Sequence, residues 1–149
     1  MSTYQTAESL ADLTHNLLTI CQTKEEWVAA QRGLFQAEFK CLRVFGSDKS
    51  LTCKEIANRM NLSRSRITRV IDGLEKKGYM NREIDQTDRR NMRVTLSRRG
   101  KIFTTKLNRE FTDMHYEILQ DIDVSKHESL ITTLEHLLTA TEKWLQKSL

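Results

Sequence analysis

The segment from Leu51 to Gly100 constrains the fold of this chain more than any other part of the sequence. It contains two short helical patterns separated by a polar turn, and Gly78 ends the second of them. After Gly78, β-type residues near Ile84 and again from Met92 to Leu96 flank a polar loop, which predicts a two-stranded hairpin. This order of elements, helix, turn, helix and hairpin, is typical of a winged DNA-reading unit.

The composition places the chain among folded, helix-rich proteins. Its 149 residues are enough for one domain with an extension, and 38% hydrophobic with 30% charged residues is ordinary for such a protein. No apolar run approaches the ~20 residues that a membrane span requires. The first ten residues lack the basic start and apolar block of a secretory signal, so we expect a cytoplasmic protein.

Positive charge is concentrated in the middle of the chain. Between Ser63 and Lys101 there are twelve Lys or Arg and five Asp or Glu, a local net charge of +7. The whole chain carries +4, so the remaining residues carry −3. Such a distribution is common in solvated helices as well as in nucleic-acid-binding proteins, but on this order of elements it favours a polyanionic partner.

Several helix starts can be predicted from capping residues, since the chain has no proline. A hydroxyl residue followed three positions later by Glu matches the capping-box pattern. The pairs that match are Thr23 with Glu26, Thr52 with Glu55, and Ser125 with Glu128, while Ser63 and Ser97 are candidate N-caps without the box.

Long amphipathic helices are expected at both ends of the chain. Their apolar stripes begin at Leu10 in the first helix, at Ile102 in the second and at Leu130 in the third. These stripes need a covering surface, and a second copy of the chain is the simplest one, so we expect a homodimer. The alternative is that these helices fold back onto the core of their own chain.

The exposed side of the second short helix carries the residue types that read DNA. The apolar residues, Ile67, Ile71 and Leu74 among them, face the core. The first half of the opposite side carries hydroxyl and guanidinium groups that suit base edges and phosphates in a major groove. The predicted DNA contacts of this helix are Ser63, Arg64, Ser65, Arg66, Thr68 and Arg69.

The loop of the hairpin supplies a second set of predicted contacts. Arg89 or Arg90 at its tip can enter a minor groove, where the negative potential attracts Arg. Asp88 would repel phosphate, so we expect it to pair with a nearby Arg and to shape the loop. Arg82 could be that partner or could clamp a phosphate, and Arg93 completes the predicted set.

The segment from Leu51 to Gly100 resembles the winged helix-turn-helix of the MarR family of bacterial transcription regulators. The matching residues are Leu51-Thr52, Glu55-Ile56-Ala57, Ser63, Thr68-Arg69, Leu74 to Gly78, Arg82, Asp85, Asp88-Arg89-Arg90, Leu96-Ser97 and Gly100. The chain departs from the family's usual pattern at Phe35, where a hydroxyl residue is common, and at Gln86, where proline is common.

The resemblance implies a mainly α fold with a small β-hairpin wing, in a single domain over residues 1–149. Residues 34–100 would form the DNA-binding region, and residues 1–33 and 101–149 the dimerisation helices. The resemblance also implies a homodimer that binds double-stranded DNA at a palindromic operator, usually as a repressor. An effector pocket would lie between the dimerisation and DNA-binding parts.

Residues that could sense a signal are few. Cys21 is a candidate redox sensor by resemblance to peroxide-sensing members of the family, and the alternative is a packing role on the first apolar stripe. Cys41 is expected to pack in the core, and Cys53 to be exposed. The candidates for contacting a small effector are Trp27, Arg32, Phe35 and Arg43. The spacing of the four histidines predicts no metal site.

Two other classes of function fit the sequence less well. One is a winged-helix module whose basic surface binds an acidic protein, but the exposed half of the second short helix has none of the aromatic anchors typical of protein interfaces. The other is an enzyme, and no phosphate-binding loop, nucleophile elbow or other catalytic motif is present, nor any cofactor motif.

Overall fold

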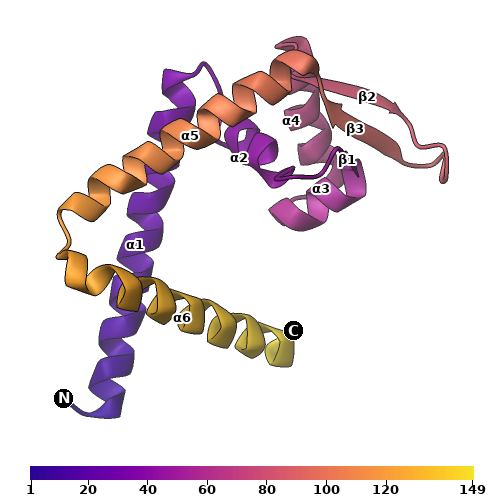
Figure 1. Ribbon diagram of the computed structural model, residues 1–149. Helices are drawn as coiled ribbons and strands as arrows, with labels where there is room; N and C mark the ends of the chain where they lie inside the picture. Colours follow the sequence, from indigo (N-terminus) through magenta and orange to yellow (C-terminus); the bar gives the residue numbers. More distant parts are fainter. The chain divides into compact units, whose positions relative to one another are not determined.

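The computed structural model describes residues 1–149 and divides into two compact units, Met1–Asn108 and Arg109–Leu149. It is mainly helical with one small antiparallel sheet (Figure 1). In chain order the elements are α1 (Thr3–Gln31), α2 (Gln36–Val44), β1 (Ser50–Thr52), α3 (Cys53–Met60), α4 (Arg64–Lys76), β2 (Met80–Ile84), β3 (Met92–Leu96), α5 (Arg98–Gln120), the 3-10 helix η1 (Val124–Lys126) and α6 (His127–Ser148).

The core of the first unit lies between α2, α3, α4 and the sheet. Each of the three short helices buries one face, because its apolar residues recur at helical spacing. Their fully buried side chains include Phe39, Leu42, Ile56, Ile67, Ile71 and Leu74, and the sheet adds Val94 among others. Asn61 ends α3 in the left-handed conformation, with φ 53°, and so makes the tight turn into α4.

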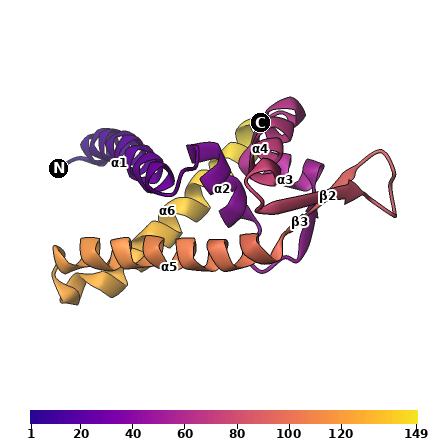
Figure 2. The same cartoon turned by 90° about the horizontal axis from the view of Figure 1, so that it is seen from above.

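The wing is a three-stranded sheet rather than the two-stranded hairpin that was predicted. The strand order is β1-β3-β2, and both pairs are antiparallel. Val94 at the centre of β3 pairs with Leu51 on one side and with Arg82 on the other. The loop between β2 and β3 extends away from the helices (Figures 1 and 2).

The end of α4, the start of β2 and the start of α5 meet at one tight junction. Gly78 adopts φ 84°, where glycine is favoured, and reverses the chain after α4. Oγ of Ser97 donates to the carbonyl of Gly78 at 2.6 Å and accepts from the N–H of Gly100 at 2.9 Å. A Cβ on Gly100 would collide with the carbonyl oxygen of Tyr79. The junction therefore fixes the start of α5 against the end of α4.

Three of the five predicted helix caps are present in the structure, and two are not. Thr52, Ser63 and Ser97 each accept a hydrogen bond from a backbone N–H in the first turn of the following helix, as predicted. The second bond of the predicted capping box at Thr52 is not formed, because the Glu55 carboxylate accepts from the Thr52 hydroxyl instead of its backbone N–H. The prediction at Thr23 was wrong, because α1 continues through it and its hydroxyl donates to the carbonyl of Thr19. The prediction at Ser125 was also wrong, since Asp123 caps η1 in its place.

The long helices carry large apolar side chains that their own chain leaves exposed. On α1 these include Leu10, Leu13, Leu17, Leu18 and Ile20, and on α6 they are Ile131, Leu134, Leu138, Trp144 and Leu145. No residue of α6 is buried. None of the helices combines the length and the apolar character needed to cross a membrane.

Candidate nucleic-acid interface

Helix α4 presents its polar side to solvent along its first two turns. Six residues predicted to contact DNA (Ser63, Arg64, Ser65, Arg66, Thr68 and Arg69) are all exposed, whereas Ile67 between them is fully buried. Neither Arg66 nor Arg69 forms an ion pair within the chain, so both guanidinium groups are available to an external anion. The helix thus offers free cations beside short hydroxyl side chains, a combination that suits phosphates and base edges.

The first residue of α4 is tied to the wing. Nη2 of Arg64 donates to Oδ1 of Asn91 at 3.2 Å, and Nδ2 of Asn91 donates to Oδ2 of Asp88 at 3.2 Å. These bonds join two segments that lie more than twenty residues apart. The first residue of α4 is therefore connected to the wing loop through Asn91.

The base of the wing loop is held by a buried carboxylate. Asp85 is buried, and its Oδ1 accepts from Nε of Arg93 at 3.2 Å. Nη1 of Arg93 also donates to Oγ of Ser50 at 2.7 Å, which links β3 to β1. Burying an unpaired carboxylate is costly, so this pair stabilises the observed loop. The guanidinium of Arg93 is thereby engaged within the protein.

At the loop tip, Asp88 pairs with Arg90. Oδ1 of Asp88 accepts from both the backbone N–H and Nε of Arg90, each at 3.1 Å. These hydrogen bonds lower the pKa of Asp88 below its ordinary value, because they favour the ionised carboxylate. The predicted pairing of Asp88 with a nearby arginine is therefore present. The side chain of Arg90 is 90% exposed, and the neighbouring Arg89 is exposed without an ion pair.

Arg82 is not the partner of Asp88 that the sequence suggested as one alternative. Its Nη2 lies 2.7 Å from Oδ1 of Asp72 and 3.3 Å from Oε1 of Glu75, both on α4. Strand β2 places Arg82 beside the second half of α4 rather than at the loop tip. The two acids on this helix thus bind a cation of the wing.

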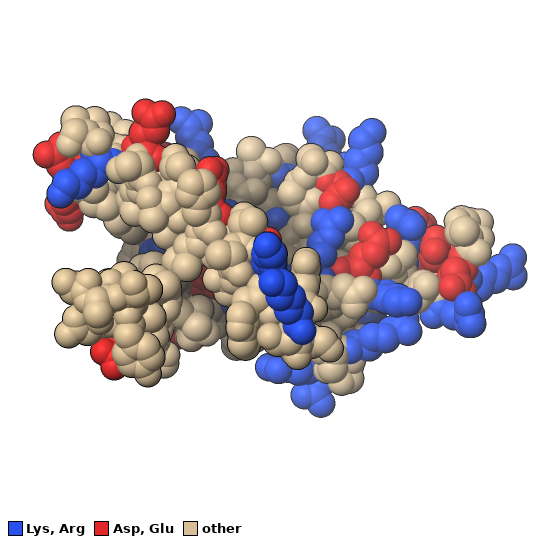
Figure 3. Space-filling model, turned by 90° about the horizontal axis from the view of Figure 1, so that it is seen from below, with Lys and Arg blue, Asp and Glu red and all other residues tan.

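Lys and Arg side chains gather over the winged part of the surface, at the right of Figure 3. Several acids lie among them, and Asp72, Glu75, Asp85 and Asp88 are each paired with an arginine of the same region. These four acids are thus paired locally, whereas Arg66, Arg69 and Arg89 are exposed without an ion pair inside the chain and add positive charge to this surface.

An aromatic side chain lies beside α4, although the sequence predicted no aromatic anchor on this surface. Phe35, the N-cap of α2, is 75% exposed and lines a pocket of about 350 Å³ together with Arg66, Arg69 and Gly73 of α4. An aromatic anchor next to unpaired cations is compatible with a protein partner as well as with DNA.

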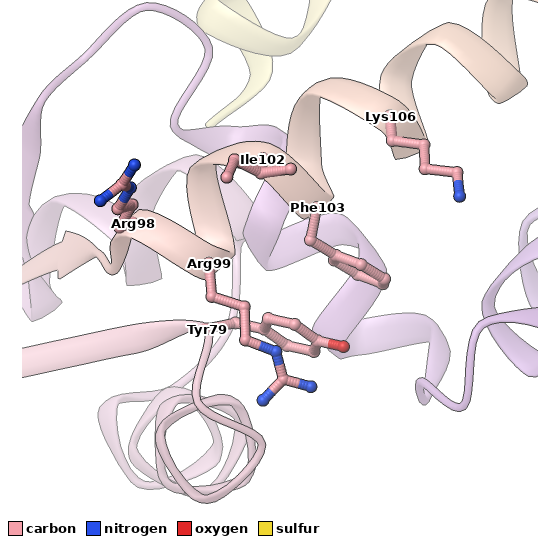
Figure 4. A pocket seen from close by; sticks show the side chains of 6 residues that line it. All are labelled: Tyr79, Arg98, Arg99, Ile102, Phe103 and Lys106. Atoms are coloured by element: carbon pink, nitrogen blue, oxygen red, sulfur yellow. The ribbon is translucent and has the colours of Figure 1, made fainter.

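A second pocket, of about 530 Å³, lies at the junction of α4, β2 and α5. The rings of Tyr79 and Phe103 stack with centroids 4.2 Å apart, and the guanidinium of Arg99 lies 5.0 Å from the centroid of Tyr79. Figure 4 shows Arg99 extending along the Tyr79 ring, with Ile102 and Phe103 on the adjoining turn of α5. The pocket has an apolar floor and only cationic charges around it.

The other predicted effector residues do not converge on one cavity. Phe35 lines the pocket beside α4, whereas Arg43 lines a different pocket with Glu25 and Lys40. Trp27 is mostly exposed on α1. Arg32 is the C-cap of α1 and lines neither pocket.

The three cysteines occupy different environments. Cys21 is half-buried on α1, with Nζ of Lys24 at 3.9 Å from its sulfur. Cys41 is buried, as expected, and burial, together with Cys53 and Glu38 nearby, raises its pKa to about 12. The prediction that Cys53 is exposed was wrong: it is buried, and burial raises its pKa despite the neighbouring Arg82 and Arg64. Its helix-terminal position therefore does not activate this thiol.

Comparison with known proteins agrees with this architecture. The MarR family model matches residues 34–92. The transcriptional regulator SarZ of Staphylococcus haemolyticus is 25% identical over 118 residues, which is 78% of this chain and 78% of SarZ. The transcriptional repressor YetL of Bacillus subtilis is 34% identical over 74 residues, which is 48% of this chain and 44% of YetL.

Solved structures show the same fold. The transcriptional regulator BldR from Sulfolobus solfataricus superposes with a TM-score of 0.78 at 23% identity, covering 94% of this chain and 99% of BldR. A mutant of Escherichia coli MarR complexed with operator DNA has a TM-score of 0.73 at 20% identity, covering 95% of this chain and 99% of that one. The predicted fold class, mainly α with a small β wing, is confirmed.

Proposed function

Because this chain belongs to the MarR family of winged-helix transcriptional regulators, we propose that two copies form a homodimer that binds a palindromic operator. The dimer represses transcription until a small ligand or oxidation releases it. It acts on DNA in the cytoplasm, and its DNA-binding region spans residues 34–100.

The observation that carries this proposal is the exposed first half of α4. Arg66 and Arg69 stand on it without ion-pair partners, next to the hydroxyls of Ser65 and Thr68. Arg can bond bidentately to guanine, and short hydroxyls can bond to bases or phosphates. These four side chains are proposed to meet the major groove, with Ser63 and Arg64 next to the backbone at the start of the helix.

The wing residues divide into contacts and supports. Arg89 and Arg90 at the exposed tip are proposed to reach the minor groove. Asp88, Arg82 and Arg93 are engaged in ion pairs within the protein and are proposed to hold the wing in shape. Their contribution to DNA binding is then indirect, through the position of the tip.

The exposed apolar side chains of α1 and α6 support the dimer. Helix α6 has 22 residues and none of them is buried, so it lacks the tertiary packing that stabilises most helices in water. A second copy of the chain would cover its apolar side chains. The helices of residues 1–33 and 101–149 are therefore the proposed dimerisation region. Sedimentation velocity should give twice the mass of one chain at micromolar concentration, and a monomer would contradict this part.

The operator can be found without knowing the regulated genes. Selection from random duplexes should yield a two-fold element whose half-sites lie about one helical turn apart. Affinity for the selected duplex should fall steeply as salt rises, because bound Arg and Lys release counterions. An affinity that stays constant from low to moderate salt would contradict the proposal and favour the acidic protein partner, for which Phe35 would be the anchor.

Release by a ligand would use the pocket at Tyr79 and Phe103. Its apolar floor and its cations Arg98, Arg99 and Lys106 suit an organic anion with a flat apolar body. The probe 8-anilinonaphthalene-1-sulfonate should therefore bind with a rise in fluorescence and lower the affinity for the operator. Phe103→Ala should weaken both effects together, and binding that leaves operator affinity unchanged would refute the role in release.

Oxidation offers the alternative route of release, through Cys21. Peroxide would convert this half-buried thiol to a sulfenic acid. Operator affinity should then fall in the wild type and be retained in Cys21→Ser. If affinity is unchanged although mass spectrometry shows Cys21 oxidised, the cysteine serves packing only.

A further inference from the structure

A carboxylate of α2 is buried against the second half of α4. Glu38 is only 3% exposed, and its Oε1 accepts from the backbone N–H of Phe35 at 2.8 Å and from Nζ of Lys77 at 2.6 Å. A carboxylate so far from water is costly unless it is paired and hydrogen-bonded. This one is held by one bond from its own helix start and one from the end of α4.

Lys77 joins three segments through one ammonium group. Besides Glu38, its Nζ donates to the carbonyl oxygen of Gly33 at 2.9 Å, in the turn between α1 and α2. The same nitrogen lies 5.2 Å from the ring centroid of Phe35. Lys77 is also the C-cap residue of α4. The end of α4 is therefore tied to both the turn before α2 and the first turn of α2.

Gly73 lets the two helices approach at this point. A Cβ on Gly73 would lie 2.5 Å from Oε2 of Glu38, so any larger residue would displace the carboxylate or the helix. Glycine in the interior of a helix is unfavourable. Here its lack of a side chain makes room for the carboxylate of Glu38.

The anchored residues share a face of α4 with the DNA-reading arginines. Residues 66, 69, 73 and 77 follow one another at intervals of three or four, which places them along one side of a helix. Arg66, Arg69, Gly73 and Glu38 line the same pocket. The contact at Gly73 and Lys77 therefore lies on the side of α4 that carries Arg66 and Arg69, next to the face that Ile67, Ile71 and Leu74 bury in the core.

Small rotations matter at this distance from the axis. If α4 rotated by about 20° about its own axis, a side-chain atom that lies about 5 Å from the axis would move by about 2 Å. A hydrogen bond to a base edge tolerates a few tenths of an ångström. Phosphate contacts, which depend on charge more than on angle, tolerate far more.

We propose that Glu38 and Lys77 are positioning residues for sequence reading: they set the rotation of α4 and thereby the direction of Arg66 and Arg69. The proposal rests on the proposed function, the reading of DNA by α4. Neither residue needs to touch DNA. Loss of the contact should lower the preference for the operator over other sequences, with little loss of general affinity for duplexes.

The test measures affinities for two duplexes of equal length, the selected operator and a scrambled one, at one salt concentration. Glu38→Gln raises the net charge by one, so binding to the scrambled duplex should hold or rise, while operator binding should fall about tenfold. Purely electrostatic effects would move both affinities in the same direction. Circular dichroism and thermal melting establish that each variant is folded.

Lys76 supplies a matched control for Lys77. It is exposed at the adjacent position and forms no ion pair, so Lys76→Gln and Lys77→Gln remove the same charge from the same helix end. Both should weaken scrambled-DNA binding equally, but only Lys77→Gln should lower the operator preference. The double variant Glu38→Gln with Lys77→Gln replaces the charged pair by two amides and should recover part of that preference.

The outcomes distinguish failure of this inference from failure of the proposed function on which it rests. If the wild type selects no sequence at all, the proposed function itself fails. If the wild type selects an operator but folded Glu38→Gln and Lys77→Gln keep its preference, only the positioning role is overturned. Should Glu38→Gln not fold, the comparison of Lys77→Gln with Lys76→Gln decides, and an operator preference that is equal in these two folded variants overturns the positioning role.

Discussion

Arg64 and Asn91 are hydrogen-bonded across 3.2 Å, so the first residue of α4 holds the end of the wing loop. Asn91 is also hydrogen-bonded to Asp88, and Asp88 in turn binds Arg90 at the tip. The reading helix and the wing tip are therefore parts of one hydrogen-bonded structure. A substitution at one end of this network is therefore expected to affect the position of the side chains at the other end.

Arg90→Ala should weaken operator binding more than Arg98→Ala. Both changes remove one positive charge, but Arg90 lies at the exposed wing tip and Arg98 at the start of α5. We expect a loss of about tenfold for Arg90→Ala, on the order of 1.4 kcal/mol. Fluorescence anisotropy with labelled operator measures both variants, and equal losses would refute the wing-tip role.

Asp85→Asn should destabilise the protein, whereas Asp88→Asn should change stability little. Asp85 is buried and pairs with Arg93, which would lose its charged partner. Removing one partner of such a half-buried pair should cost roughly 1–3 kcal/mol in the free energy of unfolding. The exposed pair of Asp88 and Arg90 should contribute little, because water screens their attraction. Urea denaturation of the two variants compares them, and similar losses would contradict the assignment.

The carboxyl group of Asp88 should titrate below its ordinary pKa of 3.8, because the side chain and backbone of Arg90 favour its ionised form. Since the folded pKa is the lower one, Asp88 stabilises the folded loop above pH 3.8 and loses this contribution as the pH falls through the folded pKa. Carbon-detected NMR titration gives the midpoint. In Arg90→Ala the midpoint should return toward 3.8, and an unshifted midpoint in the wild type would exclude the pairing in solution.

N-ethylmaleimide at pH 8 should label Cys21 before the other two cysteines. Cys41 has a pKa of about 12 and is buried, so almost none of it is thiolate at this pH. Burial also raises the pKa of Cys53. Mass spectrometry should find one rapid label per folded chain and three after unfolding in urea. Rapid labelling of Cys53 in the folded protein would show that its burial is incomplete.

The sequence by itself determined the elements whose causes are local. Helical spacing of Ile67, Ile71 and Leu74 predicts both the helix and its buried face, and hence the exposed face with Arg66 and Arg69. The caps at Ser63 and Ser97 are local, because each hydroxyl oxygen accepts a hydrogen bond from the backbone N–H three residues later. These features depend on residues within one or two turns, so a pattern in the chain is enough to find them.

Only the tertiary structure decided which distant groups meet. Strand β1 has three residues, too few for a periodic signal, and exists because β3 pairs with it. Arg82 binds Asp72 and Glu75 rather than Asp88, since strand direction places it beside α4. Glu38 and Lys77 are 39 residues apart, and no sequence spacing predicts their contact. The physical reason is that an ion pair forms wherever folding brings opposite charges within reach, and that distance is set by the packing of whole elements.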